Sequence, residues 1–414
     1  MTTKSTKSKT IVLPMEAEIY RSFLKDRKLA REIIDDRYSV YPDLFPRGMQ
    51  NGYSLNGSTR VSKKQKGFVM RQILINNETY RLRPSFMLPY NKGLVSEVSK
   101  ALFLKKFGVP FWALAFVFGH TPMWWYRLYL SLGYYDLVGT TIYEPEDLPV
   151  NLIADEHHIK VKGEKKYVAT TVAEGCFLGM VVCDGADEAS LLGGSQVFKE
   201  EALLVKSDYQ PETINTDGWF ATQNAWSKLF VGIQVIECFL HAFLKVRDRA
   251  TKKMKDFFLT ASDKIWNAYR AKSKRQLAQQ IRRLREWTNK NIVDCPMKKN
   301  ILKLCKKKAK WMKHIDFQNA YRTSNMLDRL MRIMKRHKMN SQMFHSTTEA
   351  TTLNFRALAL IHNFSPYSPS LWENKEKISS PVKKLNQREL AEDWLENLIL
   401  SAYRANFKYH CNPL

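Results

Sequence analysis

Three aspartates occur where the sequence predicts regular backbone elements that could bring them together. Asp155 and Asp217 each close a run rich in β-branched residues, and Asp328 lies in the helix-like segment Thr323–Arg332. Carboxylate oxygens are preferred ligands of hard divalent cations. Phosphoryl-transfer sites that use two such cations hold them about 3.5–4 Å apart. Three converging carboxylates could therefore hold two ions and act on a phosphodiester.

Each of these aspartates also has a simpler explanation. Asp217 lies in the segment Asn215–Gly218, whose composition is typical of a turn, and Asp328 could form an ion pair on a helix surface. His157 follows Asp155 by two residues, so in a strand both side chains would point to the same face. His157 could approach the ions, or it could be an ordinary packed or surface histidine.

The order of predicted elements around the first two aspartates indicates a mixed α/β sheet. Three antiparallel strands come first, and helices then alternate with two short strands. Asp155 lies on the first strand and Asp217 at the end of the fourth, and from residue 238 to 338 the sequence is predominantly helical. The expected elements are strands at 150–155, 165–172, 176–183, 212–217 and 231–237, and helices at 188–205 and 218–230.

The charge of the chain favours a polyanionic partner. Its 414 residues include 66 basic and 40 acidic ones, for a net charge of +26. Between His241 and Asn340 there are 29 Lys or Arg and 7 Asp or Glu, which leaves +22 in this stretch alone. A solvated helix surface would explain a short basic run, but so many uncompensated charges favour contact with phosphates. The expected phosphate-binding run consists of Lys306, Lys307, Lys308 and Lys310.

The interval between Asp217 and Asp328 predicts a folded helical insertion, because it is far longer than a connecting loop. Trp266, Trp287 and Trp311 lie within this interval. One of them could stack on a nucleic-acid base, although each taken alone is better explained as part of a helical core.

The segment 95–132 has the form of a helix-turn-helix DNA-binding unit. Its residues Gly119–Pro122 supply a sharp turn, a threonine N-cap and a proline at the first helical position. In such a unit the helix after the turn enters the major groove. Trp124 and Arg127 are therefore candidate DNA contacts, whereas Trp125 is better explained as part of the small core.

The length of the chain predicts several structural regions, and its cysteine content predicts a protein that works in a reducing compartment. Six cysteines without a Cys-x-x-Cys pair argue against a zinc ribbon and against a disulfide framework. The longest apolar run, 109–118, is too short for a membrane span, and no secretory signal is visible. The expected regions are a partly disordered N-terminal arm (1–60), a DNA-binding region with a hairpin and the helix-turn-helix (61–145), the first part of a core (146–245), a basic all-helical insertion (246–320), the acid-bearing and last helices of the core (321–365), and a linker with a C-terminal helix (366–414).

In their order and spacing these features resemble the ribonuclease-H-like core of DDE transposases, over about residues 150–365. The resemblance is greatest to the Mutator-like and hAT-like group and its prokaryotic insertion-sequence relatives. The segment Glu237–His241 matches the Cys-x-x-His signature of this group, and Ser324–Arg329 is similar to its acid-bearing helix. The third acid of the family is usually glutamate, so Glu349 stays a reserve candidate beside Asp328.

The resemblance implies an α/β fold in which an all-α insertion interrupts a ribonuclease-H-like mixed sheet, after a helical DNA-binding region. It implies a transposase that binds terminal inverted repeats and that cuts and joins double-stranded DNA with two Mg²⁺ or Mn²⁺ ions. Asp155 would contact both ions, and Asp217 and Asp328 would contact one each. Arg329 and Arg332 would contact DNA.

The Cys-x-x-His pair, Cys238 and His241, has no second pair at zinc-ligand spacing, so a structural or DNA-positioning role is expected. The protein is expected to act as a dimer or larger assembly on DNA, without a membrane, in a prokaryotic cytoplasm and associated with the nucleoid. Two other functions fit the same residues. One is a catalytically inactive DNA-binding regulator derived from a transposase, and the other is a ribonuclease-H-like nuclease that does not transpose.

Overall fold

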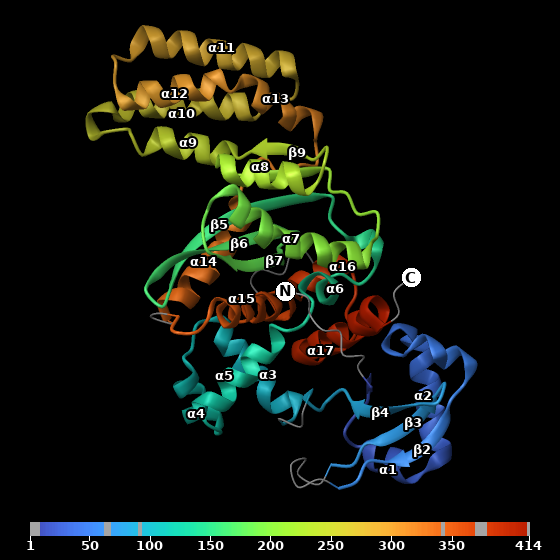
Figure 1. The fold of residues 1–414 in the computed structure, drawn as a ribbon. Helices are drawn as coiled ribbons and strands as arrows, with labels where there is room; N and C mark the ends of the chain where they lie inside the picture. The colour runs from blue at the N-terminus through green and yellow to red at the C-terminus, as the bar shows by residue number, and fades with distance from the viewer. Residues whose placement is uncertain (1–8, 62–67, 90–92, 341–343, 369–378, 412–414) are drawn as a thin grey trace.

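The structure, a computed structural model, describes residues 9–61, 68–89, 93–340, 344–368 and 379–411. Figure 1 shows a helical block at one end, a central sheet flanked by helices, and a smaller N-terminal sheet at the other end. The helical block and the N-terminal unit each have a hydrophobic cluster of their own, and further clusters line the central sheet. None of the described helices combines the length and the apolarity needed to cross a membrane.

The N-terminal residues form a small α/β unit that continues to residue 84, which differs from the arm expected to end near residue 60. Its sheet has the order β1-β4-β3-β2, in which Thr10 of β1 pairs with Arg81 of β4. The expected hairpin is β3–β4, and Asn76 and Asn77 at its turn have positive φ. The elements are β1 (Thr10–Leu13), α1 (Tyr20–Lys25), α2 (Arg27–Val40), β2 (Ser54–Ser58), β3 (Arg71–Ile75) and β4 (Glu78–Pro84).

The segment 95–132, for which the sequence predicts a helix-turn-helix form, consists of three helices. The Thr121 hydroxyl accepts a hydrogen bond from the Trp124 backbone N–H at 3.2 Å and so caps the third helix. Trp125 is buried, as expected, whereas Phe116 on the second helix is 86 % exposed. The helices are α3 (Val95–Lys106), α4 (Phe111–Phe118) and α5 (Pro122–Leu132), followed by the short α6 (Leu137–Thr141).

The central sheet has the order β7-β6-β5-β8-β9. Its first three strands form the predicted antiparallel meander, and β8 and β9 run parallel to β5. The mixed α/β architecture predicted from the sequence is therefore confirmed. The elements are β5 (Asn151–Val161), β6 (Glu164–Ala173), β7 (Cys176–Cys183), α7 (Glu188–Val205), β8 (Thr213–Thr216), α8 (Phe220–Leu229) and β9 (Gln234–Glu237).

Helices cover both faces of this sheet. On one face, Ile153 and Val168 pack against α14 (Asn325–Asn340), α15 (Thr348–Phe364) and α5 in a single hydrophobic cluster. On the other face, Phe198 of α7 and Trp226 of α8 belong to a second cluster with strand residues such as Leu178. Burial of side chains on both faces explains why β7, whose sequence has no charged residue, is apolar along its whole length.

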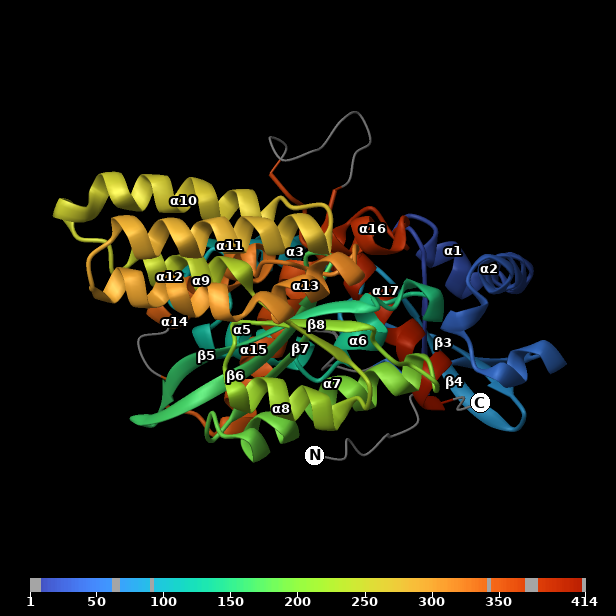
Figure 2. The same ribbon diagram turned by 90° about the horizontal axis from the view of Figure 1, so that it is seen from above.

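The chain between β9 and α14 forms a helical block with its own core, as predicted for the insertion. Phe239, Leu284 and Trp311 are buried together there, and residues 239–316, all of which the structure describes, contain no strand. Figures 1 and 2 show this block beside the β8–β9 side of the sheet. Its helices are α9 (Phe239–Arg247), α10 (Lys255–Tyr269), α11 (Lys274–Asn291), α12 (Pro296–Lys306) and α13 (Lys308–Asp316).

The C-terminal helix α17 (Trp394–Ala405) contributes to three clusters, after the short α16 (Pro381–Asn386). Leu398 belongs to the cluster shared with α14 and α15, Leu400 to that of the N-terminal unit, and Ala405 to that of α7 and α8. A π-helical turn (Asn406–Cys411) follows this helix, so residues 394–411 join regions that are far apart in the sequence.

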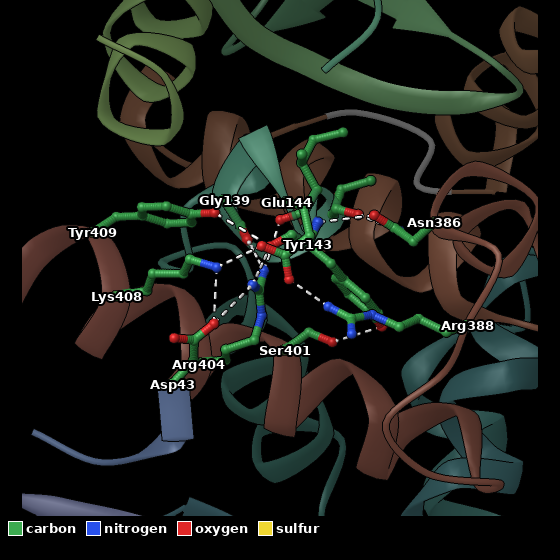
Figure 3. Close-up of polar contacts among 12 residues, drawn as sticks. Asp43, Gly139, Tyr143, Glu144, Asn386, Arg388, Ser401, Arg404, Lys408 and Tyr409 are labelled. Carbon is green, nitrogen blue, oxygen red and sulfur yellow. Dashed lines mark hydrogen bonds and ion pairs between the residues drawn. The ribbon is translucent and has the colours of Figure 1, made fainter. Parts of the chain in front are cut away.

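Polar contacts at the end of α17 connect the same regions (Figure 3). Arg404 is 3 % exposed and donates to the Tyr143 carbonyl oxygen, while its guanidinium lies over the Tyr143 ring. Lys408 donates to Glu144 and forms an ion pair with Asp43 of the N-terminal unit, both at 2.8 Å. Residues 394–411, called the C-terminal segment below, therefore connect the N-terminal unit to the central region.

Candidate active site

The pairing of β5 with β8 places Asp155 and Asp217 at the same level of the sheet. Ile153 pairs with Asn215 in parallel register, two residues before each aspartate. Neighbouring strands lie about 4.8 Å apart, and residues in parallel register point to the same face. The two carboxylates therefore share one face, and both are half-buried. Here the structure brings together the first two residues that the sequence predicted.

After the helical block, hydrogen bonds hold residues 321–322 against the ends of β8 and β9, close to Asp217. The Asn215 side chain donates to the Tyr321 carbonyl oxygen at 2.7 Å, and the Phe239 backbone N–H donates to the Arg322 carbonyl oxygen at 3.1 Å. Helix α14 begins three residues later and carries Asp328 in its first turn. Its apolar side then packs on the face of the sheet that carries Asp155.

The Asp155 carboxyl is influenced by both other acids. Burial and the negative charge of Asp217 raise its pKa to about 6, and Asp328 adds a smaller effect in the same direction. A hydrogen bond from the Glu156 backbone N–H, at 2.8 Å, and the charge of His241 lower it. Three acids from β5, the end of β8 and the start of α14 thus form one electrostatic group.

The chemistry of this group suits a divalent cation. Carboxylates supply only oxygen ligands, which Mg²⁺ and Mn²⁺ prefer. The raised pKa of Asp155 means that its charge is poorly compensated, and a cation between the acids would remove that penalty. Within the described residues, no group of three His, Cys, Asp or Glu side chains lies close enough together to hold a metal ion.

Of the two candidates for the third acid, the structure brings Asp328 to this group and leaves Glu349 outside it. Glu349 lies in the first turn of α15 and is exposed, and the charged groups that act on it are Asp184 and Lys162. Asp155 is not among them.

The Cys-x-x-His pair lies beside Asp328. Cys238 follows β9 and is fully buried, and its sulfur accepts the Ser324 backbone N–H at 3.3 Å. The Ser324 hydroxyl contacts the Cys238 sulfur at 3.4 Å and His241 Nδ1 at 3.3 Å, and it donates to the Asp328 carboxylate at 3.2 Å. The two motif residues and the third acid are therefore joined by one serine, whose part in the site the sequence alone did not indicate.

His157 and Glu156 occupy opposite faces of β5, as expected from strand alternation. His157 is buried beside α14, and burial together with the charges of Lys338, His158 and Lys335 lowers its pKa to about 4. Among the described residues, the charged groups that act on the pKa of His157 are all basic. Glu156 accepts a hydrogen bond from the Thr222 hydroxyl of α8, and burial raises the pKa of Glu156 to about 7.

The four lysines expected to bind phosphate lie where α12 meets α13, but they are not equivalent. Lys306 and Lys308 are exposed. Lys307 and Lys310 instead form ion pairs with the two carboxylate oxygens of Glu237, the last residue of β9, which is 4 % exposed. Two of the four lysines are therefore already engaged with a buried acid.

The other predicted DNA contacts lie on helix surfaces. Arg329 and Arg332 are exposed on α14, adjacent in sequence to Asp328 and one turn beyond it. Arg127 is exposed on α5, whereas Trp124 is half-buried and stacks on the His120 ring with centroids 3.9 Å apart. Their contact with DNA stays a prediction.

The three tryptophans of the helical block differ in exposure from the two aromatic residues that follow Asp217. Trp311 is buried in the core of the helical block, and Trp266 and Trp287 pack against the same core. Trp219 and Phe220, which directly follow the Asp217 turn, are 53 % and 72 % exposed. Their exposure could not be inferred from the sequence, because an apolar pair at a helix start is usually buried.

Comparison of the sequence with models of known protein families gave no match, and a comparison with curated proteins found no match either.

Proposed function

We propose that the chain is a DDE-type DNA transposase whose catalytic site consists of Asp155, Asp217 and Asp328. The main support is the arrangement of the three acids, which come from two adjacent parallel strands and a helix start separated by a folded insertion. The strand order β7-β6-β5-β8-β9 is compatible with a ribonuclease-H-like core. Each acid taken singly has little weight, and the proposal depends on all three.

Two bound Mg²⁺ or Mn²⁺ ions would supply charge neutralisation at the scissile phosphodiester. Asp155, whose pKa reflects the charges of both other acids, would contact both ions. Asp217 and Asp328 would hold one ion each. The Asp217 carboxylate is oriented by a hydrogen bond from the Trp219 backbone N–H at 2.7 Å, so the turn after β8 fixes this ligand.

Exposed cations near these acids support double-stranded DNA as the substrate. Arg329 and Arg332 extend from the site along α14, and Lys306 and Lys308 face solvent on the helical block. Arg127 of α5 would contact the inverted repeats through the helix-turn-helix. Binding by such residues depends on phosphate charge and so weakens as salt rises.

The test uses the full-length protein and DNA that carries the inverted repeats flanking its own gene, with Mg²⁺ or Mn²⁺. We expect wild-type protein to cut at the repeat ends and to join them to a target plasmid. Asp155→Asn, Asp217→Asn and Asp328→Asn should each bind the DNA and fail to cut it, because the ligand charge is lost while the basic surface remains. Glu349→Gln is the matched control and should cut like wild type.

Two outcomes would replace this proposal. Tight binding to the repeats without any cutting by wild-type protein would mean a catalytically inactive regulator. Cutting that depends on Asp155 but never yields joined products would mean a nuclease of the same fold.

A further inference from the structure

Ser324 connects the Cys-x-x-His pair, Cys238 and His241, to Asp328. Ser324 is the last residue before α14, and it is 2 % exposed. Its hydroxyl lies within 3.4 Å of Cys238, His241 and Asp328, and its carbonyl oxygen accepts the Asp328 backbone N–H at 2.8 Å. The start of α14 is thereby attached to the residues that follow β9.

We propose that Cys238, His241 and Ser324 are positioning residues that hold Asp328 in place to bind a divalent cation with Asp155. This inference rests on the proposed function. The three side chains are not themselves ligands in this scheme. They restrict where the first turn of α14 can lie after the chain returns from the helical block.

Asp328 needs a local attachment because it is separated from the other two acids by the helical block. Asp155 and Asp217 are fixed by strand pairing, whereas Asp328 arrives through a folded block of residues 239–316 with a separate core. Any tilt of that block would move the start of α14 unless it were attached locally. Cys238 provides the attachment on the sheet side, because its own backbone N–H donates to the Thr216 carbonyl oxygen at 2.7 Å.

The charges of the group agree with this arrangement. A hydrogen bond that the protonated imidazole of His241 donates to the Cys238 sulfur raises the pKa of His241 to about 9 against the effect of burial, and the charges of Cys238, Asp155 and Asp328 act in the same direction. A cationic His241 close to two carboxylates lowers their repulsion. Burial raises the pKa of Cys238, but hydrogen bonds with His241 and Ser324 more than compensate and leave it below its ordinary value.

The experiment measures binding of Mn²⁺ alone to the full-length protein by the loss of the free Mn²⁺ electron paramagnetic resonance signal. Removal of a group that orients a metal ligand typically weakens metal binding by about 10–100-fold. We expect Ser324→Ala and Cys238→Ala to weaken Mn²⁺ binding within that range. Cys238→Ser, which keeps a hydrogen-bonding group at the same place, should retain most of the affinity.

Ser401→Ala is the matched control. It also removes a buried serine hydroxyl, one that donates to the Tyr143 hydroxyl at 2.9 Å away from the acids. It should lower the thermal unfolding temperature and leave Mn²⁺ affinity unchanged. A purely structural role for Ser324 would make the two serine variants behave alike, which would overturn the inference.

Asp155→Asn separates this inference from the proposed function. If Asp155→Asn loses Mn²⁺ binding while folded Ser324→Ala and Cys238→Ala retain it, the positioning role is wrong and the metal site stands. If Asp155→Asn binds Mn²⁺ as well as wild type, the three acids are not a metal site and the proposed function itself fails.

Discussion

At the scale of single residues, Asp155 shows a conflict between stability and function. Its carboxylate is half-buried beside two other acids, and its pKa is raised to about 6 from 3.8 by burial first and by Asp217 second. Without a cation, the ionised side chain therefore destabilises the folded protein. Active sites often retain such unfavourable groups because the ligand compensates for them.

Replacing Asp155 by asparagine should accordingly stabilise the metal-free protein at pH 7.5 while it abolishes cutting. Because the folded-state pKa lies above the unfolded one, the folded protein binds more protons between about pH 4 and 6. The stability of wild type therefore falls as pH rises through this window, and the penalty is complete above it. We expect a gain of about 1–2 kcal/mol for Asp155→Asn at pH 7.5, after allowance for solvent screening.

Thermal unfolding of both proteins in a chelator at pH 4.5 and pH 7.5 measures this effect. The stability difference should be small at pH 4.5 and larger at pH 7.5. Added Mn²⁺ should raise the unfolding temperature of wild type only, since ligands stabilise the state that binds them. A variant that is less stable than wild type at pH 7.5 without metal would contradict this reading of the site.

Gly218 allows a second test at the same scale, because it follows Asp217 with a φ of +95°. A Cβ at this position would lie 3.0 Å from the Glu237 carboxylate, so alanine would strain the turn and shift Asp217. The left-handed conformation alone costs about 1–2 kcal/mol for a residue with a side chain. Gly218→Ala should lose both stability and cutting activity.

The control for Gly218→Ala is Gly193→Ala, in the middle of α7, where nothing lies within 4 Å of the added Cβ. Alanine is favoured over glycine in a helix by about 1 kcal/mol. Denaturant unfolding should therefore show Gly193→Ala to be as stable as wild type or more so, with full activity. Equal behaviour of the two alanine variants would mean that the Asp217 turn tolerates a side chain.

The sequence could predict the strands that carry Asp155 and Asp217 because each aspartate follows a run of residues that favour a strand. It placed the end of the first strand at Asp155, whereas β5 continues to Val161 through its pairing with β6. It could not show that Lys307 and Lys310 pair with Glu237, since α13 and β9 meet only through the folding of the helical block. The contacts of Ser324 with Cys238 and His241 could not be predicted either, because they also join segments that are far apart in the sequence. Side-chain pairs between distant segments leave no periodic signal in the sequence.

At the scale of elements, the junction of α12 and α13 carries two kinds of lysine. We expect the exposed pair, Lys306 and Lys308, to affect DNA binding, and the pair bonded to Glu237, Lys307 and Lys310, to affect stability. Substituting Lys306 and Lys308 by glutamine removes two exposed charges. If both contact phosphate, the slope of log K against log salt should fall by about 2, while unfolding stays unchanged. Binding assays at several salt concentrations measure this slope, and an unchanged slope would mean that these lysines are only solvated.

The complementary pair is Lys307 and Lys310. Substituting both by glutamine leaves the buried Glu237 carboxylate without its partners, which should cost about 1–3 kcal/mol. The salt slope should change less than with the exposed pair. Denaturant unfolding checks the first expectation. A stable double variant with a strongly reduced slope would mean that these lysines leave Glu237 to bind DNA.

Predictions from the sequence held best for elements with strong local signals. The Thr121 cap and Pro122 marked α5, and the β-branched residues of 165–172 and the apolar run at 176–183 marked the meander. The N-terminal unit was missed because β1 is only four residues long and pairs with β4, from which α1, α2, β2 and β3 separate it in the sequence. Such a strand becomes stable only through a distant partner, so local composition could not distinguish it from an extended arm.

At the scale of the whole molecule, the regions that would bind and cut DNA are held together by the C-terminal segment. Helix α17 shares hydrophobic clusters with the N-terminal unit and with both faces of the central sheet. Lys408 adds ion pairs to Asp43 and Glu144 from these two regions. The site acids lie far from this segment in sequence but depend on the core that it completes.

Arg404 is the residue through which this dependence can be measured. It is 3 % exposed, and its guanidinium donates to the carbonyl oxygens of Gly139, Ile142 and Tyr143 (Figure 3). Arg404→Ala would leave these buried acceptors without a donor and remove packing against the Tyr143 ring. Since each unsatisfied buried group costs about 1–3 kcal/mol, we expect a loss of at least about 3 kcal/mol.

Arg388 is the control, because it also contacts Glu144 and the Tyr143 ring but is 54 % exposed. Exposed ion pairs contribute about 0–1 kcal/mol, so Arg388→Ala should unfold close to wild type. Limited proteolysis and thermal unfolding would compare the two variants. Because the C-terminal segment joins the regions, Arg404→Ala should expose the N-terminal unit to protease and reduce cutting, although no acid of the site has changed. Protection equal to wild type in Arg404→Ala would show that the regions hold together without this contact.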